Sequence, residues 1–165
     1  MAAQARKSAK GKSAKRTGEP RFNRYVRTVR RWLWRAALTV AALVAFMVGL
    51  YALVNPPVTP YMVAERLREG PVRHDWVPME RIAPVMARSV VAAEDANFCL
   101  HWGFDMDAIR DAIEDGGQRG ASTIPQQTVK NVYLWHGRNW FRKATEAGLT
   151  PLVELVWSKR RILEV

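Results

Sequence analysis

The chain has 165 residues, with 26 lysines and arginines against 15 aspartates and glutamates, which gives a formal net charge of +11. This length is enough for one domain of ordinary size and an additional segment. All of the excess charge lies in residues 1–35, which contain twelve basic residues and one acid, Glu19, whereas residues 36–165 are balanced. The folded part therefore lacks the basic excess that binds phosphates along a nucleic acid, and no nucleic acid is expected as a partner.

Residues 1–35 are rich in Lys, Arg, Ser, Ala and Gly. Such a composition cannot bury enough apolar surface to fold, so we expect a disordered tail. A basic tail beside a membrane contacts anionic lipid headgroups. Membrane lipid is therefore an expected partner.

Residues 36–54 (AALTVAALVAFMVGLYALV) contain no charged side chain. Nineteen helical residues span about 28 Å, close to the ~30 Å core of a bilayer. Trp32 and Trp34 lie at one end and Tyr51 near the other, where aromatic rings prefer the membrane interface. The pattern predicts one transmembrane helix, and the positive-inside rule places residues 1–35 in the cytoplasm and the rest outside.

Two other interpretations of this apolar segment are a buried core helix and a cleaved signal peptide. A signal peptide has a shorter apolar region and a shorter basic region before it. The pair Arg30-Arg31 is compatible with a twin-arginine signal, although Trp-Leu-Trp-Arg follows it. The length of the segment favours the transmembrane interpretation.

The remaining chain divides into a linker with a short helix, residues 55–71, and one domain, residues 72–165. No alternating apolar pattern typical of strands is present, so the domain is expected to be mainly α-helical. Helix-capping residues and prolines or glycines mark the helix boundaries. The predicted helices are Tyr61–Glu69, Val85–Asp95, Met106–Asp115 (capped by Asp105), Thr123 to about Trp135 (with a Thr123–Gln126 capping box), and a long helix from Trp140 (capped by Asn139) that bends at Pro151.

The single cysteine, Cys99, cannot form an intrachain disulfide. It therefore says little about the redox state of the compartment. We expect it to be a buried, small apolar residue.

Three polar clusters could carry chemistry, and the first is Glu94-Asp95 with Phe98, His101, Gly103 and Asp105. The acids follow the apolar run Val90–Ala93. Glu94 is therefore expected to be partly desolvated, as suits a general base. The alternative is that both acids are ordinary exposed residues at a helix end.

The second cluster is Gly120–Ile124 followed by Gln127, Lys130 and Asn131. Backbone N–H groups at the start of this helix can bind an anion. Gln127, Lys130 and Asn131 recur at helical spacing and share one stripe. A solvated helix face explains the stripe equally well.

The third cluster is Arg142-Lys143 with Glu146, followed by Ser158-Lys159 and Glu164. The spacing from Arg142 and Lys143 to Glu146 suits ion pairs along a helix. As a surface feature each pair contributes about 0.3–0.5 kcal/mol. As a functional feature the cations would bind a phosphate, with the carboxylate tuning them.

In order and spacing these clusters resemble the peptidoglycan glycosyltransferase family, the domain of bifunctional penicillin-binding proteins and of monofunctional biosynthetic peptidoglycan transglycosylases. The basic tail, single anchor and lack of a downstream domain are similar to the monofunctional type. The resemblance covers about residues 72–164. The matching patterns are E-D-x-x-F-x-x-H-x-G-x-D from Glu94, G-x-S-T-I-x-Q-Q-x-x-K-N from Gly120, R-K-x-x-E from Arg142 and S-K-x-x-I-L-E from Ser158.

The resemblance implies a lysozyme-like helical domain on the outer (periplasmic) side of the bacterial inner membrane. Its implied reaction polymerises lipid II into β-1,4-linked glycan strands for the cell wall, with release of polyprenyl pyrophosphate. The donor is α-linked and the product β-linked, so one direct displacement with a general base suffices.

The resemblance also implies roles for individual residues. Glu94 matches the general base for the acceptor 4-hydroxyl, and Glu146 matches a second acid near the departing pyrophosphate. The residues that would neutralise this pyrophosphate are Lys130, Arg142 and Lys143. Those that would line the donor cleft are Ser122, Thr123, Gln127 and Asn131. Those that would support Glu94 are Asp95, Phe98 and His101.

The implied partners are lipid II, the growing glycan strand and other cell-wall synthesis proteins. No cofactor is required by the sequence. Some members of the family are stimulated by a divalent cation, Mg or Mn, near the pyrophosphate, but the sequence contains no dedicated pattern of metal ligands.

At Ile162–Val165 the family continues into Tyr-Leu-Asn and further helices, so the domain is expected to be incomplete at its C-terminus. The helix that ends there would then lack a partner for its apolar face. This leaves two alternatives to an active transferase. One is an inactive membrane protein that binds lipid II or cell-wall synthesis partners. The other, suggested by Glu94-Asp95, is a peptidoglycan-cleaving enzyme of lysozyme-like fold.

Overall fold

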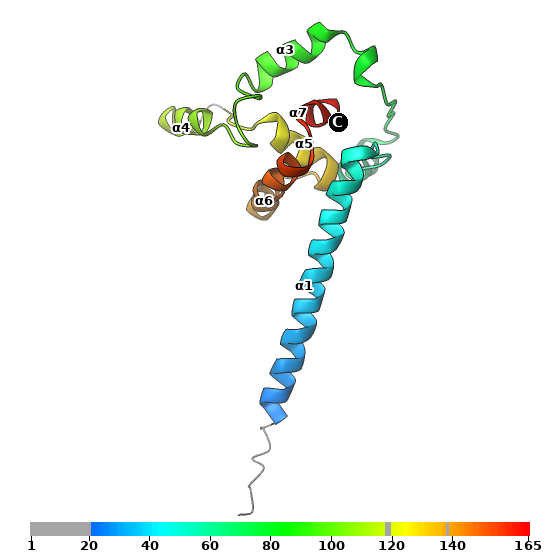
Figure 1. The fold of residues 1–165 in the computed structure, drawn as a ribbon, viewed down its shortest axis with the longest axis vertical. Coiled ribbons are helices and arrows are strands. Elements are labelled where there is room, and N and C mark those ends of the chain that lie inside the picture. Colours follow the sequence, from blue (N-terminus) through cyan, green and yellow to red (C-terminus); the bar gives the residue numbers. More distant parts are fainter. Residues whose placement is uncertain (1–20, 118–119, 138) are drawn as a thin grey trace, which may run out of the picture. The chain divides into compact units, whose positions relative to one another are not determined.

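The computed structural model describes residues 21–117, 120–137 and 139–165. These residues form helices, turns and extended connections and contain no strand, which confirms the prediction of a mainly α-helical chain. The chain comprises two compact units, Met1–Ala41 and Ala42–Val165. The helices are α1 (Arg21–Leu53), α2 (Pro60–Glu69), the 3-10 turn η1 (Met79–Arg81), α3 (Pro84–Glu94), α4 (Met106–Glu114), α5 (Ile124–Tyr133), α6 (Trp140–Val156) and α7 (Lys159–Glu164) (Figure 1).

Helix α1 begins at Arg21, well before the apolar run. The prediction of a disordered tail is therefore wrong for residues 21–35, while residues 1–20 lie outside the described residues. No glycine or proline interrupts the sequence between Arg21 and Val48. Once the apolar segment has formed a helix, each further residue adds a hydrogen bond without a new nucleation step, so the helix extends into the basic segment.

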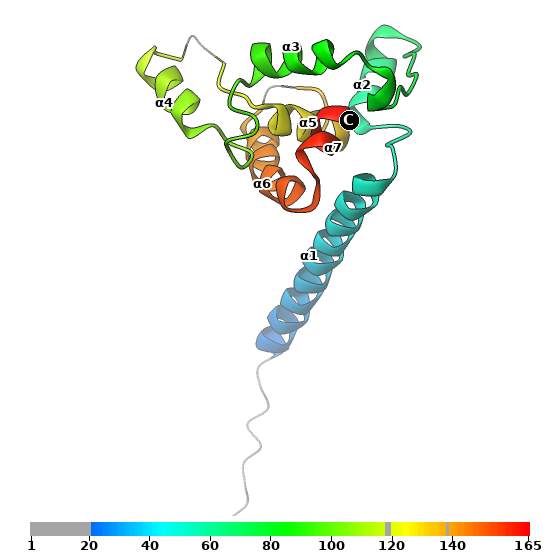
Figure 2. The same ribbon diagram turned by 45° about the horizontal axis from the view of Figure 1, so that its top comes forward.

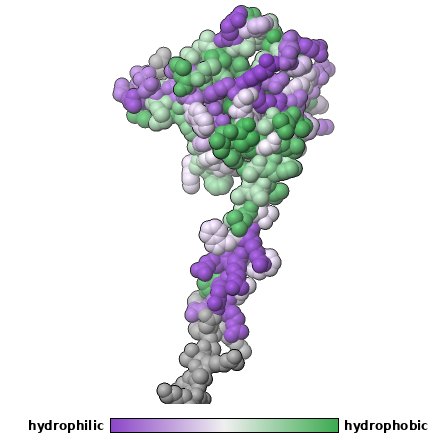
Figure 3. All heavy atoms as spheres, viewed as in Figure 1, coloured by the Kyte–Doolittle hydropathy of each residue, from purple (hydrophilic) through white to green (hydrophobic). Residues whose placement is uncertain are grey.

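Within the described residues, one helical segment, Asn23–Leu53, is long and apolar enough to cross a membrane by length and composition. Its most apolar window has a mean hydropathy of 2.3. Thr39, the one threonine of the apolar run, donates its hydroxyl proton to the carbonyl of Arg35 at 2.9 Å and therefore needs no water. Figure 3 shows the hydrophilic side chains of the first turns of α1 and the apolar ones that follow.

The core of the second unit lies where α5, α6 and α7 meet the last turns of α1. Figures 1 and 2 show α5, α6 and α7 packed together, with α4 projecting outward. Helix α3 has no buried side chain, and α4 buries only Ala112. The buried apolar side chains of the core are Val48, Phe98, Ile124, Val129, Val132, Leu134, Val153, Trp157 and Ile162.

Helix α7 is well packed, which contradicts the expectation that its apolar face lacks a partner. Ile162 is only 1% exposed, and Leu163 and Val165 lie against the core. The hydroxyl of Thr128 on α5 also donates to the carbonyl of Ile162 at 3.1 Å. The faces of α5 and α6 already supply the burial that this short helix requires.

The predicted helix starts are confirmed by their capping bonds. The Asp105 carboxylate accepts from the backbone N–H groups of Asp107 and Ala108. Thr123 and Gln126 form the reciprocal capping box. Asn139 accepts from the backbone N–H of Arg142 at 2.7 Å. These bonds satisfy donors that every helix start leaves free, which is why local sequence predicts them well.

The turn after α3 corrects the expectation for Cys99, which is exposed rather than buried. Its neighbour Phe98 is 2% exposed and occupies the core instead. Adjacent residues of a turn point in different directions, and the larger apolar side chain takes the buried position because it removes more apolar surface from water.

The same turn ends at Gly103, whose φ of +80° favours glycine. A Cβ atom at this position would lie 2.7 Å from Cγ2 of Thr150 and 3.3 Å from Cγ of Glu154. The missing side chain therefore allows the turn to lie directly on α6. Gly116 has a similar φ of +72°, but a Cβ there would meet no atom within 4 Å.

We predict that Gly103→Ala destabilises the chain more than Gly116→Ala. Both substitutions place a side chain in left-handed backbone, which costs about 1–2 kcal/mol. Only Gly103→Ala also forces a contact with the branched Thr150 side chain, which adds about 1–3 kcal/mol. Thermal unfolding of the detergent-solubilised chain, followed by circular dichroism, measures the difference. Equal losses of stability would show that the turn does not depend on this contact.

Candidate functional site

Glu94 is the last residue of α3 and is exposed, so the expectation of partial desolvation is wrong. The cause is that the residues before it, Ala92 and Ala93, are also exposed on a helix that buries no side chain. Its Oε2 atom accepts a hydrogen bond from Nε2 of Gln127 at 3.0 Å. Glu94 lines a pocket of about 320 Å³ together with Ala92, Ala93, Asp95, Ala96, Asn97, Asp105, Ala108, Asp111, Gly120, Ala121, Ser122 and Thr123.

Asp95, in contrast, is 6% exposed and joins three segments of the chain. Its Oδ2 accepts from the backbone N–H of Ile124 at 2.9 Å, at the start of α5. Its Oδ1 lies 2.8 Å from Nε2 of His101 in the turn after α3. A carboxylate at a helix N-terminus is further stabilised by the helix dipole. Asp95 therefore fixes the end of α3, and with it Glu94, beside α5.

His101 and Phe98 support this arrangement from the other side. The ammonium group of Lys159 donates to the carbonyl of His101 at 2.7 Å and lies 4.7 Å from the Phe98 ring centroid. The same ammonium pairs with Glu154 at 2.7 Å. The predicted supporting residues of Glu94 are thus brought together, in contact with α6 and the residue that begins α7.

Thr123 is buried and acts within the backbone framework of the site. Its hydroxyl donates to the carbonyl of Gly103 at 2.6 Å, and its backbone N–H donates to Oε1 of Gln126 at 3.1 Å. The preceding residue, Ser122, is exposed, with its Oγ atom 3.5 Å from Nζ of Lys143. The segment before α5 therefore connects the Glu94 pocket with the cations of α6.

Those cations converge on Glu146, which is 2% exposed. Oε2 of Glu146 pairs with Nη1 of Arg142 at 2.8 Å, and Oε1 pairs with Nζ of Lys143 at 2.5 Å. The interpretation as a surface ion pair is therefore wrong, because the shared carboxylate is buried. The buried carboxylate of Glu146 requires charged partners, which Arg142 and Lys143 supply. Because two cations share one carboxylate, the cluster has a net positive charge.

Lys130 is partly buried on α5 and, within the part of the chain that the structure describes, its ammonium has no acceptor or ion-pair partner. It lines a second pocket, of about 280 Å³, with Tyr61, Trp135, His136, Gly137 and Arg142. An ammonium without a partner beside a guanidinium is suited to an anion. Asn131 is exposed, and its side chain makes no hydrogen bond to another candidate residue in the described ranges.

Trp135 also borders an apolar groove of about 610 Å³ between the last turns of α1 and helices α5 and α6. Tyr133 in this groove has a buried hydroxyl without a hydrogen-bond partner among the described residues. Burial, and secondarily the neighbouring Tyr51, raises the pKa of Tyr133, so its phenol remains neutral. The other lining residues are Leu43, Val44, Met47, Val58, Thr59, Pro60, Val63, Val132, Leu134, Thr145 and Leu149.

Sequence reasoning did not identify several residues that line these pockets. Asn97 and Asp111 line the Glu94 pocket, and Tyr61 and His136 line the Lys130 pocket. The ring of His136 lies against that of Tyr61, with centroids 5.5 Å apart. Residues 61 and 136 are far apart in sequence, so no local pattern could have paired them. Asp111 carries the weak signal of an acid on the helix that Asp105 caps.

Asp105 lines the Glu94 pocket and is also the N-cap of α4. The backbone N–H of Ala108 and the side-chain amide of Asn97 hold the pKa of Asp105 below its usual range, because both stabilise the charged form. Nδ2 of Asn97 donates to Oδ2 of Asp105 at 2.8 Å. The cap and the wall of the pocket therefore depend on one ionised carboxylate.

We predict that Asp105→Ala lowers the free energy of unfolding by about 1 kcal/mol at neutral pH, as loss of an N-cap does. A depressed pKa stabilises the fold above the unfolded-state value of about 3.9 and loses this effect as pH falls through the folded value. The stability gap between wild type and variant should therefore be constant at neutral pH and shrink below about pH 4. Thermal unfolding in detergent over this pH range measures the gap; an unchanged gap in acid would contradict the assignment.

The described residues thus form a helical domain with an exposed carboxylate and a set of cations on either side of the segment that begins α5. This arrangement suits group transfer between a hydroxyl and a phosphate-linked donor. The family model for transglycosylases matches residues 62–165, more than half of the sequence. The chain belongs to this family.

Curated relatives agree with this assignment. The chain is 59% identical to a biosynthetic peptidoglycan transglycosylase of Jannaschia sp. (strain CCS1) over 165 residues, which are 100% of the chain and 66% of the relative. Proteins with the same name in Caulobacter vibrioides and Yersinia pseudotuberculosis are 46% and 43% identical, over 87% and 81% of the chain and 65% and 61% of the relatives. The chain therefore spans about two thirds of the length of the relatives it matches.

Proposed function

We propose that the chain carries the catalytic residues of a peptidoglycan glycosyltransferase, which polymerises lipid II into β-1,4-linked glycan and releases polyprenyl pyrophosphate. The observation that carries the proposal is the placement of Glu94 and the Glu146-anchored cations, connected through Gln127 and Ser122. Membership of the transglycosylase family supports the same reaction class.

In the proposed mechanism, Glu94 is the general base. Gln127 engages Oε2 and holds the carboxylate at the pocket, which leaves Oε1 to accept the proton of the acceptor 4-hydroxyl. As that O–H bond breaks, the hydroxyl oxygen forms the new bond to C1 of the donor. The bond from C1 to the pyrophosphate oxygen breaks, and its electron pair leaves with the pyrophosphate. One displacement inverts the α-linkage to a β-linkage.

The cations of α5 and α6 would stabilise the charge that develops on the leaving pyrophosphate. Lys143 is half-exposed beside Ser122, and Arg142 and Lys130 line one pocket. Glu146 fixes Arg142 and Lys143 in place before substrate binds, so little reorganisation is needed during the reaction. Its burial explains why it would act through these cations rather than as a second base.

The geometry disfavours peptidoglycan cleavage by the acid pair Glu94-Asp95. A glycosidase places two carboxyl groups on either side of the scissile bond. Both oxygens of Asp95 are occupied, by His101 and by the N–H of Ile124. Asp95 is therefore proposed to position Glu94 rather than to act as its catalytic partner.

A divalent cation is proposed to reach the site with the substrate. Within the described ranges no three His, Cys, Asp or Glu side chains form a group that could hold a metal ion. A pyrophosphate itself offers the oxygen ligands that Mg²⁺ prefers. Polymerisation with and without a chelator measures the requirement, and Lys130, Arg142 and Lys143 would supply the remaining positive charge.

We propose that α1 anchors the protein in the bacterial inner membrane, with its basic start in the cytoplasm and the domain outside. The asymmetry of basic residues supports this orientation. Because Cys99 is exposed and is the only cysteine, a membrane-impermeant maleimide should label it in intact cells whose outer membrane has been made permeable. Labelling only after lysis of the inner membrane would reverse the orientation.

The central prediction is that Glu94→Gln lowers lipid II polymerisation by about 10²–10⁴-fold, because an amide cannot accept the proton. Glu114→Gln is the matched control, since Glu114 is an exposed acid at the end of the neighbouring helix α4 and lies outside the pocket lining. Glycan formed from labelled lipid II by purified protein is the measurement.

Three outcomes of this assay separate the hypotheses. Equal polymerisation by Glu94→Gln and wild type would refute Glu94 as the base. Binding of lipid II without polymer formation by wild type would favour a binding protein. Release of fragments from purified cell wall, without polymer growth, would favour a cleaving enzyme.

A further inference from the structure

The outer end of α1 lacks the donors that normally satisfy the last carbonyl groups of a helix. The chain continues as Asn55-Pro56-Pro57, and proline has no backbone N–H. The carbonyls of Ala52 and Leu53 therefore lose the donors four residues on, and the carbonyls of the last turn must find other partners or water. Unsatisfied carbonyls would destabilise the end of a helix that spans a membrane.

Arg161 of α7 donates to two other carbonyls at this end, those of Tyr51 and Val54. Its Nε and Nη2 atoms donate to the carbonyl of Tyr51 at 3.0 and 2.9 Å, and Nη2 also donates to the carbonyl of Val54 at 2.9 Å. Its Nη1 atom donates to Oδ1 of Asn55 at 2.8 Å and to Oε2 of Glu164 at 3.1 Å. The rigid fork of a guanidinium can make these bonds at once, whereas an ammonium cannot.

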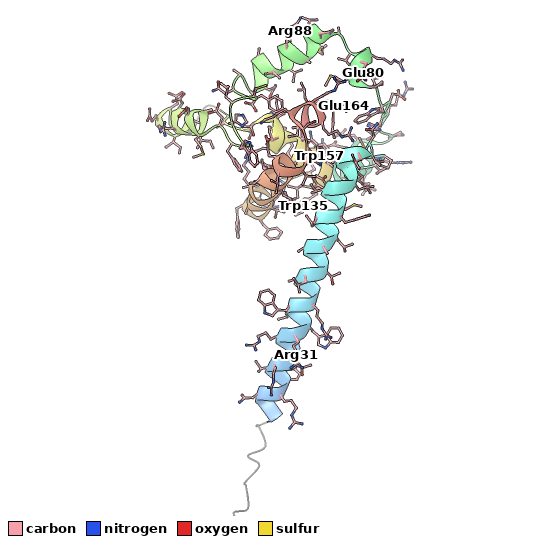
Figure 4. The ribbon with its side chains drawn as sticks, in the orientation of Figure 1. Arg31, Glu80, Arg88, Trp135, Trp157 and Glu164 are labelled. Carbon is pink, nitrogen blue, oxygen red and sulfur yellow. The ribbon has the colours of Figure 1, made fainter. Side chains whose placement is uncertain are left out.

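Aromatic rings enclose the same guanidinium. Its Cζ atom lies 5.6 Å from the Trp76 ring centroid and 5.7 Å from that of Trp157. Trp157, which is 4% exposed, donates its indole N–H to the carbonyl of Val48 at 2.8 Å, one turn earlier on α1 (Figure 4). Trp157 and Arg161 therefore fasten the last two turns of α1.

The helix that carries Arg161 is also connected to the candidate site. Ile162 accepts the hydroxyl bond of Thr128 on α5, the helix of Gln127 and Lys130. Lys159, at the other end of the same short helix, donates to the carbonyl of His101 beside Asp95. A shift of α1 relative to α7 would therefore displace α5, which carries Lys130, and the turn whose His101 contacts Asp95.

We propose that Arg161 is a positioning residue, which locks the outer end of the membrane helix to the domain and thereby fixes the height of the Lys130–Arg142 pocket at the bilayer surface. This inference rests on the proposed function and on the proposed membrane anchor. A lipid-linked pyrophosphate lies at a fixed depth in the bilayer, so the cations must meet it at that depth. Arg161 contacts no substrate in this scheme and acts through α1 and α7.

The test compares Arg161→Gln with Arg160→Gln in the full chain, reconstituted in lipid nanodiscs. Arg160 is a matched control because it is the neighbouring residue on α7, is 62% exposed at its side chain and, among the described residues, has only the exposed Glu80 as an ion-pair partner. Arg161→Lys, which keeps the charge but not the fork, serves as a milder variant if Arg161→Gln fails to fold by circular dichroism.

The first readout needs no catalytic activity. A fluorophore on the native Cys99 transfers energy to an acceptor on the lipid headgroups, and the width of the lifetime distribution reports how uniformly the domain is held above the bilayer. Wild type and Arg160→Gln should give one narrow distribution, and Arg161→Gln a broad one. Equally narrow distributions for all three would overturn the lock, whatever the activity of the protein.

The second readout separates positioning from folding. With lipid II in a bilayer, kcat/KM should fall about tenfold in Arg161→Gln, mainly through KM, which corresponds to about 1.4 kcal/mol of lost interaction. With short-chain lipid II in detergent micelles the loss should nearly disappear, because no bilayer sets the depth. An equal loss in both media would assign Arg161 a purely structural role and refute the positioning proposal. Absence of polymer from wild type would refute the proposed function. The energy-transfer readout would then still test whether Arg161 holds the domain at a fixed height above the bilayer.

Discussion

The candidate site depends on one buried carboxylate, that of Asp95. It accepts the first free N–H of α5 and the ring of His101, and so joins the end of α3, the following turn and the start of α5. Helix α3 buries no side chain, and the turn is held by Phe98 in the core, by the hydroxyl of Thr123 on the carbonyl of Gly103, and by Lys159 on the carbonyl of His101. The two adjacent acids therefore have different roles. Asp95 holds α3, the turn and α5 together, whereas Glu94 is exposed at the pocket.

Glu146 is a second buried carboxylate that fixes its neighbours, in this case the cations Arg142 and Lys143. A buried carboxylate alone would be costly, and two long cationic side chains without a partner would be mobile. Together they form an ordered cluster with a net positive charge beside Ser122. The site thus has one exposed carboxylate at the end of α3, and cations at the start of α6 and on α5.

Much of this could be predicted from the sequence, because local interactions set the helix ends. The caps at Asp105, Thr123 and Asn139 are formed by neighbours within three residues, and their predicted helices begin where expected. The motif residues around Glu94 and Glu146 were also identified as candidates, and the structure brings most of them into contact.

Burial could not be predicted in the same way. Whether Glu94, Cys99 or Glu146 is exposed depends on helices distant in sequence, and the apolar run before Glu94 gave the wrong indication because α3 lies on the surface. The bonds of Arg161 to Tyr51 and Val54 join residues more than a hundred positions apart. Helix α1 also extends beyond its apolar run, since helix propagation does not require apolar side chains.

The surface position of α3 has a consequence for how the sequence can vary. The turn η1 before α3 is fastened to α7 through Met79, whose N–H donates to Glu164 at 3.4 Å (Figure 4). Asp95 fastens its other end. The helix between them therefore works as a spacer of set length: point substitutions along its exposed faces should be tolerated, whereas insertion or deletion of a single residue would turn Glu94 by about 100° around the helix axis, away from Gln127.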